Sequence, residues 1–255
     1  MALANVDGTK IYYESVGEGP ALVLVHGSGG NHAIWWQQVP YFSQRYQTIT
    51  VDLRGFGNSD AVAGGPDARD FPRDVKGVLD DPKVGKAALL GQSIGALACL
   101  RLAVTHPQRV ACVVLAHSAG NMDHADLRAA TMADRAEAEK LSVVDRLMSK
   151  TFQARSPELT WLFHKLGTFN HANQGSIRNL ADKGPTPDEV NKSGVQIAFV
   201  AGENDRVIST KTLRKAHELV PGSTLIEVPQ GPHSLYWENP PVFNCVVDQF
   251  LQGLY

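Results

Sequence analysis

The segment from residue 87 to residue 98 constrains the fold more than any other part of the chain. An apolar run at 87–90 leads into Gly-Gln-Ser-Ile-Gly at 91–95, and small and apolar residues follow at helical spacing. The pattern predicts a buried strand that turns sharply into a helix, with Ser93 at the bend. The two glycines permit close approach of strand and helix, and the strained turn lifts the Ser93 hydroxyl clear of the sheet. Free N–H groups at the helix start face any oxyanion formed there, so the segment predicts a nucleophile that attacks a carbonyl group.

Strands alternate with helices over most of the chain. Residues 2–16 predict a hairpin with its turn at Asp7-Gly8. Further strands are expected at 21–26, 46–53, 87–90, 109–116, 195–201 and 224–228, and helices at 33–44 with an interruption near Pro40, 70–81, 94–106, 210–220 and 241–251. This order predicts an α/β fold with a mainly parallel central sheet flanked by helices, in which ligands bind beyond the C-terminal ends of the strands.

The alternation stops between residues 118 and 190. This stretch carries many charges and helical periodicity, as at 126–148, with no convincing strand. We therefore expect an inserted helical lid. The predicted organisation is a core formed by residues 1–117 and 191–255, interrupted by a lid at 118–190.

The composition of the chain indicates which kinds of partner it is expected to bind. The 255-residue chain has a formal net charge of −2 and well-mixed charges, which argues against nucleic-acid binding and favours a small-molecule substrate. No N-terminal signal pattern and no membrane-spanning apolar run are present, so a soluble, unexported, cytoplasmic protein without membrane association is expected. The three cysteines lie in apolar stretches and are expected to be reduced core thiols. The oligomeric state stays open.

A serine nucleophile needs a base, and the base needs an acid that fixes its tautomer. His233 follows the last expected strand, and Asp205 follows the strand at 195–201, so both lie in loops at the predicted C-terminal edge of the sheet. The chain order Ser93, Asp205, His233 is the order expected of this architecture. The oxyanion donors are expected to be the backbone N–H groups of Ser28, in a glycine-rich loop after the strand at 21–26, and of Ile94.

Ordinary structural roles compete with each assignment. Ser93 could be a helix N-cap, and Asp205 has rivals in Glu203, Asp182 and Asp188. Asp52 and Arg54 are interpreted as a structural pair within one loop.

The remaining histidines do not form a compact ligand pattern. His26 is assigned to the oxyanion-loop motif as a structural residue, and His106 precedes a proline at a helix end. Four more lie in or near the lid, where a surface or substrate-facing role is open: His117, His124, His164 and His171. Because no cysteine or carboxylate cluster joins them, no metal site is expected.

Five motifs together resemble the α/β-hydrolase superfamily, in its group with a helical lid. They are His-Gly-Ser-Gly-Gly at 26–30 with Trp36 downstream, Asp-Leu-Arg-Gly-Phe-Gly-Asn-Ser at 52–59, Gly-Gln-Ser-Ile-Gly at 91–95, Gly-Glu-Asn-Asp at 202–205 and His-Ser-Leu-Tyr-Trp-Glu-Asn-Pro at 233–240. Two positions depart from the family pattern: Pro232 lies between Gly231 and the histidine, and Ser209 occupies a position where a proline often follows the acid.

The resemblance implies a serine hydrolase that cleaves a small carboxylic ester or lactone through an acyl-enzyme and needs no cofactor. Dehalogenases and epoxide hydrolases similar to this fold attack with aspartate, so Ser93 disfavours them. Two alternatives remain. One is a carbon–carbon bond hydrolase of the ring-cleavage-product type, and the other is a ligand-sensing receptor on a hydrolase scaffold.

Aromatic residues near the predicted lid are candidates for a substrate pocket. They could equally pack the lid onto the core. The set is Trp35, Trp36, Phe152, Trp161, Phe163 and Phe169.

Overall fold

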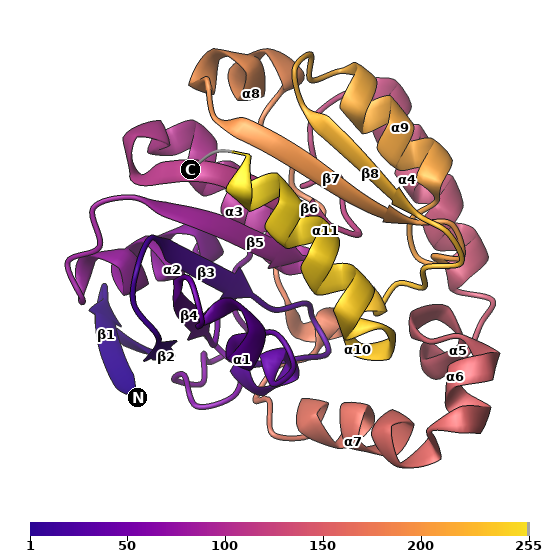
Figure 1. The fold of residues 1–255 in the computed structure, drawn as a ribbon, viewed down its shortest axis with the longest axis horizontal. Helices are drawn as coiled ribbons and strands as arrows, with labels where there is room; N and C mark the ends of the chain where they lie inside the picture. Colours follow the sequence, from indigo (N-terminus) through magenta and orange to yellow (C-terminus); the bar gives the residue numbers. More distant parts are fainter. Residues whose placement is uncertain (254–255) are drawn as a thin grey trace.

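The computed structural model describes residues 1–253 and contains one eight-stranded sheet with helices on both faces (Figure 1). The predicted fold class is confirmed. The spatial strand order is β1-β2-β4-β3-β5-β6-β7-β8, with β1 and β2 antiparallel to their neighbours and the other pairs parallel. The strands are β1 (Ala2–Val6), β2 (Thr9–Val16), β3 (Ala21–Val25), β4 (Gln47–Val51), β5 (Ala87–Gln92), β6 (Val110–Ala116), β7 (Gln196–Gly202) and β8 (Thr224–Val228).

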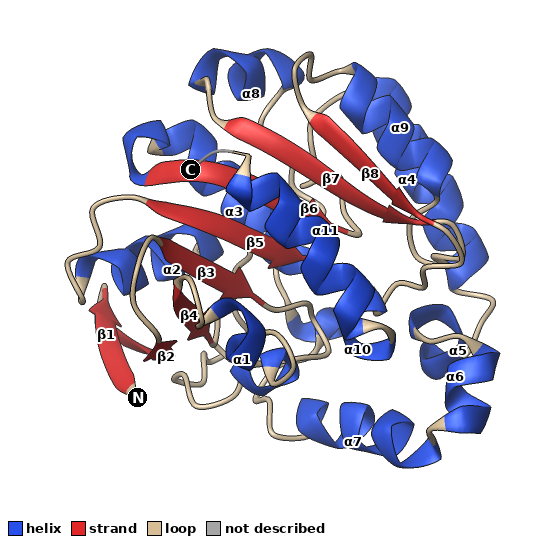
Figure 2. Ribbon diagram, in the orientation of Figure 1, coloured by secondary structure: helices blue, strands red, loops and turns tan. Residues whose placement is uncertain are grey.

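Helices connect most of these strands (Figure 2). The α-helices are α1 (Val39–Phe42), α2 (Phe71–Asp80), α3 (Ile94–Thr105), α4 (Ala125–Ala138), α5 (Val143–Leu147), α6 (Lys150–Arg155), α7 (Pro157–Gly167), α8 (Pro187–Ser193), α9 (Thr210–Glu218), α10 (Leu235–Glu238) and α11 (Pro240–Gln252). Short 3₁₀ helices are η1 (His32–Trp35), η2 (Pro107–Arg109) and η3 (Gln174–Ser176).

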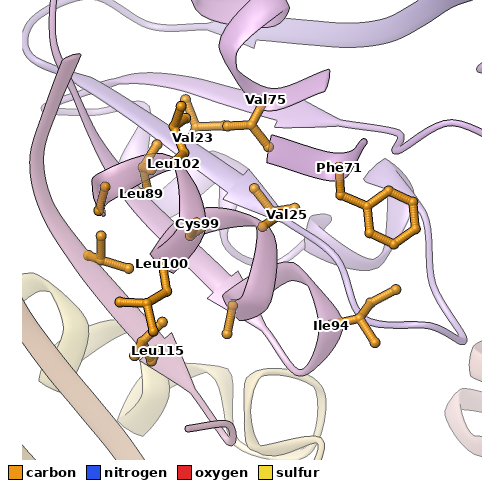
Figure 3. Packing of buried hydrophobic residues seen from close by; sticks show 14 of the residues in the cluster. Val23, Val25, Phe71, Val75, Leu89, Ile94, Cys99, Leu100, Leu102 and Leu115 are labelled. Carbon is orange, nitrogen blue, oxygen red and sulfur yellow. The ribbon is translucent and has the colours of Figure 1, made fainter. Parts of the chain in front are cut away.

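Successive side chains of the central strands enter opposite layers of the core, as the period of two in a strand requires. On one face, Val23 and Val25 of β3 pack with residues of α2 and α3, and Figure 3 shows Phe71, Val75 and Cys99 of these helices meeting them. On the other face, the alternate strand residues pack against α1, α10 and α11. Both faces are covered, which explains why the strands are continuous apolar runs.

The register brings several loops together at one edge. Val25 of β3 lies opposite Gly91 of β5, and Ala116 of β6 lies opposite both Gln92 of β5 and Val200 of β7. The segments that follow β3, β5, β6 and β7 therefore leave the sheet side by side. This arrangement positions the candidate site.

Some expectations needed correction. The helix expected at 33–44 is divided into η1 and α1, and the expected elements missed α10. Cys99 and Cys112 are buried free thiols as expected, and burial raises the pKa of both. Cys245 was wrongly assigned to the core, because its position on α11 faces solvent.

The insertion between β6 and β7 contains α4 to α8. Its two ends rest on the core, since α4 packs on α9 and α8 packs on α3. Helices α5, α6 and α7 lie beyond the C-terminal ends of the strands, at the lower right of Figure 1. Among residues 1–253, none of the helices has both the length and the apolar character needed to cross a bilayer.

A buried ion pair joins the loop after β4 to α2. The Arg54 guanidinium donates to both oxygens of Asp74 at 2.5–3.0 Å, and the Arg54 backbone N–H donates to the same carboxylate at 3.1 Å. Burial alone would lower the pKa of Arg54, but the hydrogen bonds and charge of Asp74 outweigh it and raise the pKa. Asp52 and Arg54 both have structural partners, as the sequence indicates, but they do not pair with each other: Asp52 instead binds His32 and the backbone N–H of Asn58.

We expect Arg54→Met to lower the free energy of unfolding by about 3–5 kcal/mol, because it leaves the Asp74 carboxylate buried without its partner. Urea denaturation measures the change. The double variant Arg54→Met/Asp74→Leu removes both charges and should recover most of the loss. An unchanged unfolding midpoint in the single variant would contradict a structural role for this pair.

Candidate active site

Ser93 occupies the strained turn that the sequence predicts. Its backbone has φ 52° and ψ −112°, a conformation that residues other than glycine rarely adopt. The Ser93 N–H donates to the carbonyl of Ala116 at 3.0 Å, which ties the turn to the end of β6. Although Ser93 is at the N-cap position of α3, its side chain makes no capping hydrogen bond. The hydroxyl is therefore available for chemistry, and the N-cap role does not explain this serine.

Two glycines make the turn possible by letting α3 approach β3 and β5. A Cβ atom on Gly91 would collide with the backbone of Gly95 and Ala96, and one on Gly95 would collide with the carbonyl oxygens of Val25 and His26. Both collisions involve backbone atoms that cannot rotate away. The start of α3 is thus fixed against the sheet.

Asp205 and His233 meet at the edge where β7 and β8 end. The imidazole Nδ1–H of His233 donates to the Asp205 carboxylate, at 2.9 Å from Oδ2 and 3.1 Å from Oδ1. The backbone N–H groups of Val207 and Ile208 donate to Oδ1 at 2.7 and 3.1 Å. Both side chains are buried. The structure therefore brings together the acid and the base that the chain order predicts.

A second histidine binds the same carboxylate. His117 directly follows β6, and its Nδ1 lies 3.0 Å from Oδ2 of Asp205. The side chain is fully buried, and its ring is 5.7 Å from that of His233 in an edge-to-face arrangement. The sequence indicated only a surface or substrate-facing role near the lid, so this contact was missed.

Electrostatics at this cluster favour an ionised Asp205 carboxylate and a neutral His117 imidazole. Burial would raise the pKa of the Asp205 carboxyl, but the attraction of His233 and the hydrogen bonds from both histidines hold it well below its usual range. Burial lowers the pKa of His117 more than Asp205 raises it, and the nearby His233 lowers it further. With Nδ1–H donated to Asp205, His233 keeps its Nε2 lone pair for a proton.

The Nε2 atom of His233 has a partner other than the serine. The side-chain amide nitrogen of Gln92 lies 3.2 Å from it, and Gln92 is itself buried. Within residues 1–253, the hydroxyl of Ser93 makes no hydrogen bond. Gln92 thus occupies Nε2 of His233, the atom that a catalytic serine would need.

The loop after β3 presents backbone donors near Ser93. Gly30 N–H donates to the Gly27 carbonyl at 3.1 Å, which bends residues 27–30 into a tight turn. Neither the N–H of Ser28 nor that of Ile94 donates to another residue in the described part of the chain. Free N–H groups of this kind can stabilise an oxyanion.

Asn170, just after α7 of the insertion, holds this loop in place. Its side-chain amide donates to the Gly30 carbonyl at 3.1 Å and accepts from Gly57 N–H at 3.0 Å and from the Asn31 amide at 3.1 Å. The Asn31 amide also donates to the Leu166 carbonyl of α7 at 3.0 Å. The insertion is therefore attached to the loop that carries Ser28.

A second attachment joins the insertion to the histidine loop. Glu238 of α10 accepts from the Ser149 N–H at 2.6 Å and from its hydroxyl at 2.7 Å, and Ser234 N–H donates to the Leu147 carbonyl at 3.0 Å. Partial burial raises the pKa of Glu238. The sequence did not identify these contacts.

The six aromatic residues do not share one environment. Trp35 does not fit a pocket role, because it is fully buried against Tyr236 and Phe243, with ring centroids at 5.0 and 6.5 Å. The ring centroid of Trp237 lies 6.0 Å from that of Trp36 and 5.3 Å from that of Phe163. Because Phe163 belongs to α7, its contact favours packing of the insertion onto the core. The other three are Phe152, which is buried, and Trp161 and Phe169, which are exposed.

His26, which belongs to the glycine-rich loop motif, has a structural partner. His26 is buried and accepts from the Leu53 N–H at 3.1 Å, as expected of a structural residue. In the described residues, the one group of three or more ligand-type side chains that converges is His117, Asp205 and His233, within 4.8 Å. Their facing atoms already bind one another through hydrogen bonds.

Two surface hollows lie away from the candidate site. One of about 410 Å³ is bordered by β7, β8 and α11, and the other, of about 490 Å³, by α2, α3 and residues 183–189. The second is lined by several cations, of which Arg69 and Lys76 are paired with Asp67 and Asp80. None of the predicted site residues lines either hollow.

Known proteins resemble the chain over most of its length. The family model described as alpha/beta hydrolase fold matches residues 20–240. A pimeloyl-[acyl-carrier protein] methyl ester esterase of Aliivibrio fischeri is 42% identical over 107 residues, which is 42% of this chain and 39% of that protein. The 3-oxoadipate enol-lactonase 2 of Acinetobacter baylyi is 26% identical over 91% of this chain and 89% of its own. The match thus spans about two fifths of the esterase and most of the lactonase.

A solved structure agrees with the fold. The enol-lactonase from Burkholderia xenovorans LB400 superimposes with a TM-score of 0.82 at 25% identity, covering 98% of this chain and 99% of that one. The likeness includes the insertion, because nearly all of both chains is covered.

We expect Gly95→Ala to lower the free energy of unfolding by at least about 2 kcal/mol, because the new methyl group collides with backbone carbonyls of β3 and its loop. Thermal and urea denaturation measure the loss. The matched control is Gly85→Ala, whose Cβ would have no atom within 4 Å. Equal stability of the two variants would show that α3 does not depend on this close approach.

Proposed function

Because the chain belongs to the α/β-hydrolase fold family, we propose that it is a serine hydrolase of a small carboxylic ester or lactone. Ser93 is the nucleophile, His233 the general base and Asp205 the acid that orients it. The observation that carries the proposal is the His233–Asp205 hydrogen bond at the strand ends, beside a serine whose strained backbone leaves its hydroxyl uncommitted. The ester hydrolase and the lactonase among the similar proteins support this reaction class.

The first step forms the acyl-enzyme. On substrate binding, the Ser93 hydroxyl replaces the Gln92 amide at Nε2 of His233 and gives its proton to that atom as it attacks the carbonyl carbon. Asp205 stabilises the resulting imidazolium through Nδ1. The displacement needs only a rotation of two side chains, because Gln92 and Ser93 are adjacent in the chain.

The charge that develops on the carbonyl oxygen needs donors. We assign these to the backbone N–H groups of Ser28 and Ile94, which come from the loop after β3 and from the first turn of α3. The positive end of the α3 dipole adds to their effect. Collapse of the tetrahedral intermediate transfers the proton from His233 to the alcohol oxygen, which leaves.

The second step releases the acid. His233 takes a proton from water, the hydroxide attacks the acyl carbon, and the Ser93 oxygen leaves with the proton from the imidazolium. For a lactone, the alcohol and the acid are parts of one molecule, so a single hydroxy acid is released. Apart from the substrate and this water, all groups that the proposed cycle uses belong to the chain.

We also propose that residues 118–190 form the lid over this site. Helices α5 to α7 lie beyond the strand ends and are attached at Ser149 and Asn170. A cover at this position excludes water from the acyl-enzyme and limits the size of the acyl group. The candidates that remain for the pocket wall are Trp36 and Phe163, whose rings contact Trp237, and the buried Phe152.

We expect Ser93→Ala to reduce kcat for p-nitrophenyl acetate and butyrate by about 10³-fold or more, because the acyl-enzyme cannot form. Release of p-nitrophenol measures turnover of the esters, and pH titration measures turnover of γ-butyrolactone and an acyl-homoserine lactone. A fluorophosphonate should add one adduct mass to the wild type, located at Ser93, and none to the variant.

Ser43→Ala, a serine change at the end of α1, is the matched control and should keep wild-type kcat. Absence of turnover of every ester and lactone by the wild type, or undiminished turnover by Ser93→Ala, would refute the proposal.

A further inference from the structure

We propose that His117 is a positioning residue of the site, which shares the Asp205 carboxylate with His233 and thereby sets the pH at which the base becomes active. The inference rests on the proposed function, because it concerns the acid and the base of that reaction. It adds a residue that lies outside the five sequence motifs.

The sheet register places His117 beside the acid. Ala116, its predecessor, lies opposite Val200 of β7, and the His117 N–H extends this pairing by donating to the Val200 carbonyl at 2.9 Å. At φ 55° the chain then turns in a left-handed conformation. The turn directs the side chain along the edge toward the loop after β7, where Asp205 accepts its Nδ1–H.

The hydrogen bonds fix the protonation of this ring. Asp205 is an acceptor, so His117 carries its proton on Nδ1, and its Nε2 is left as a buried atom without a hydrogen-bond partner in the described residues. A buried polar atom left unpaired is unfavourable by itself. The hydrogen bond from Nδ1–H to Asp205 is then the contribution that offsets the cost of the unpaired Nε2 atom of His117.

Two imidazole N–H groups donate to one oxygen of Asp205, and this restricts the rotation of the carboxylate and divides its negative charge. Oδ2 receives Nδ1–H from His117 and from His233, while Oδ1 is bound by the backbone of residues 207 and 208. The carboxylate therefore cannot rotate about its Cβ–Cγ bond without breaking bonds on both sides. Each donor also takes part of the negative charge, so less of it stabilises protonated His233. We infer that His117 keeps His233 unprotonated, and hence active, to lower pH.

Among the described residues, the groups that act electrostatically on His117 are Asp205 and His233 alone. Asp134 of α4 reaches the same loop, but its carboxylate accepts from Ser209 and Thr212 at the start of α9. Burial lowers the pKa of His117, which favours the neutral form of this ring.

Two variants of His117 distinguish the effect of its N–H donor from the effect of its side-chain volume. His117→Asn places an amide N–H at the same number of bonds from the backbone as Nδ1–H, and asparagine tolerates positive φ. His117→Leu has the same branching without a donor. Circular dichroism and the melting temperature identify the temperature range in which both variants are folded, and a fluorophosphonate titration gives the fraction of active sites.

For His117→Leu, we expect the acid limb of the pH profile of kcat/KM for p-nitrophenyl acetate to move up by roughly 0.5 pH unit. The plateau kcat should fall roughly threefold to tenfold with KM unchanged, because His117 orients the acid and does not touch the substrate. His117→Asn should restore the acid limb to the wild-type position. Superimposed acid limbs for the three proteins, or an acid limb that moves equally in both variants, would overturn the proposal.

A spectroscopic measurement tests the hydrogen bond without turnover. In proton NMR of uniformly ¹⁵N-labelled protein, two downfield imidazole N–H resonances are expected, and His117→Asn should remove one of them. Detection of only one such resonance in the wild type would overturn the shared carboxylate. Failure of the wild type to hydrolyse any ester would instead refute the proposed function, while the NMR result would still report on His117.

Discussion

The close packing of α3 against β3 and β5 is the contact on which the site depends. It requires hydrogen in place of a side chain at Gly91 and Gly95, because backbone atoms fill the space that a Cβ would need. The approach holds Ser93 in a conformation with positive φ that an isolated chain would leave. Since the sheet on one side and the helix on the other are both buried, the strain at one residue is small beside the packing that maintains it.

Asp205 presents a second constraint, which is the burial of a charge. A carboxylate removed from water is stable only when its oxygens are fully hydrogen-bonded. Two backbone N–H groups and two imidazoles supply those bonds here. The same contacts that stabilise the buried charge also fix the orientation of His233, so the stability of the loop and the geometry of this imidazole have one origin.

The sequence predicts the fold class well because each central strand is apolar on both faces and each ends in a glycine-bearing or polar loop. The neighbourhood of Ser93, Asp205 and His233 followed from the rule that parallel strands end together. The same rule, applied to β6, would have placed His117 there as well. It was overlooked because the residue opens the insertion and was grouped with the charged helices that follow.

Other features of the structure depend on contacts between segments that are far apart in the sequence, and the sequence pattern does not contain this information. The choice of Asp74 over Asp52 as partner of Arg54 depends on how α2 packs on the loop. The exposure of Cys245 and the burial of Trp35 depend on which side of their helices faces the sheet. In short amphipathic segments near Pro40 and Pro240, several orientations bury similar area, so the pattern alone does not select one.

The insertion is attached by side chains close to each end of its outlying part, at Ser149 and at Asn170. In the terms of protein engineering, these two residues mark the boundaries of an exchangeable module. A graft that keeps a hydroxyl at the first boundary and an amide at the second leaves the histidine loop and the loop of Ser28 undisturbed. If the insertion is the lid proposed above, the intervening residues 150–169 can diverge while both attachments are kept, and substrate preference then changes by replacing one continuous piece of sequence.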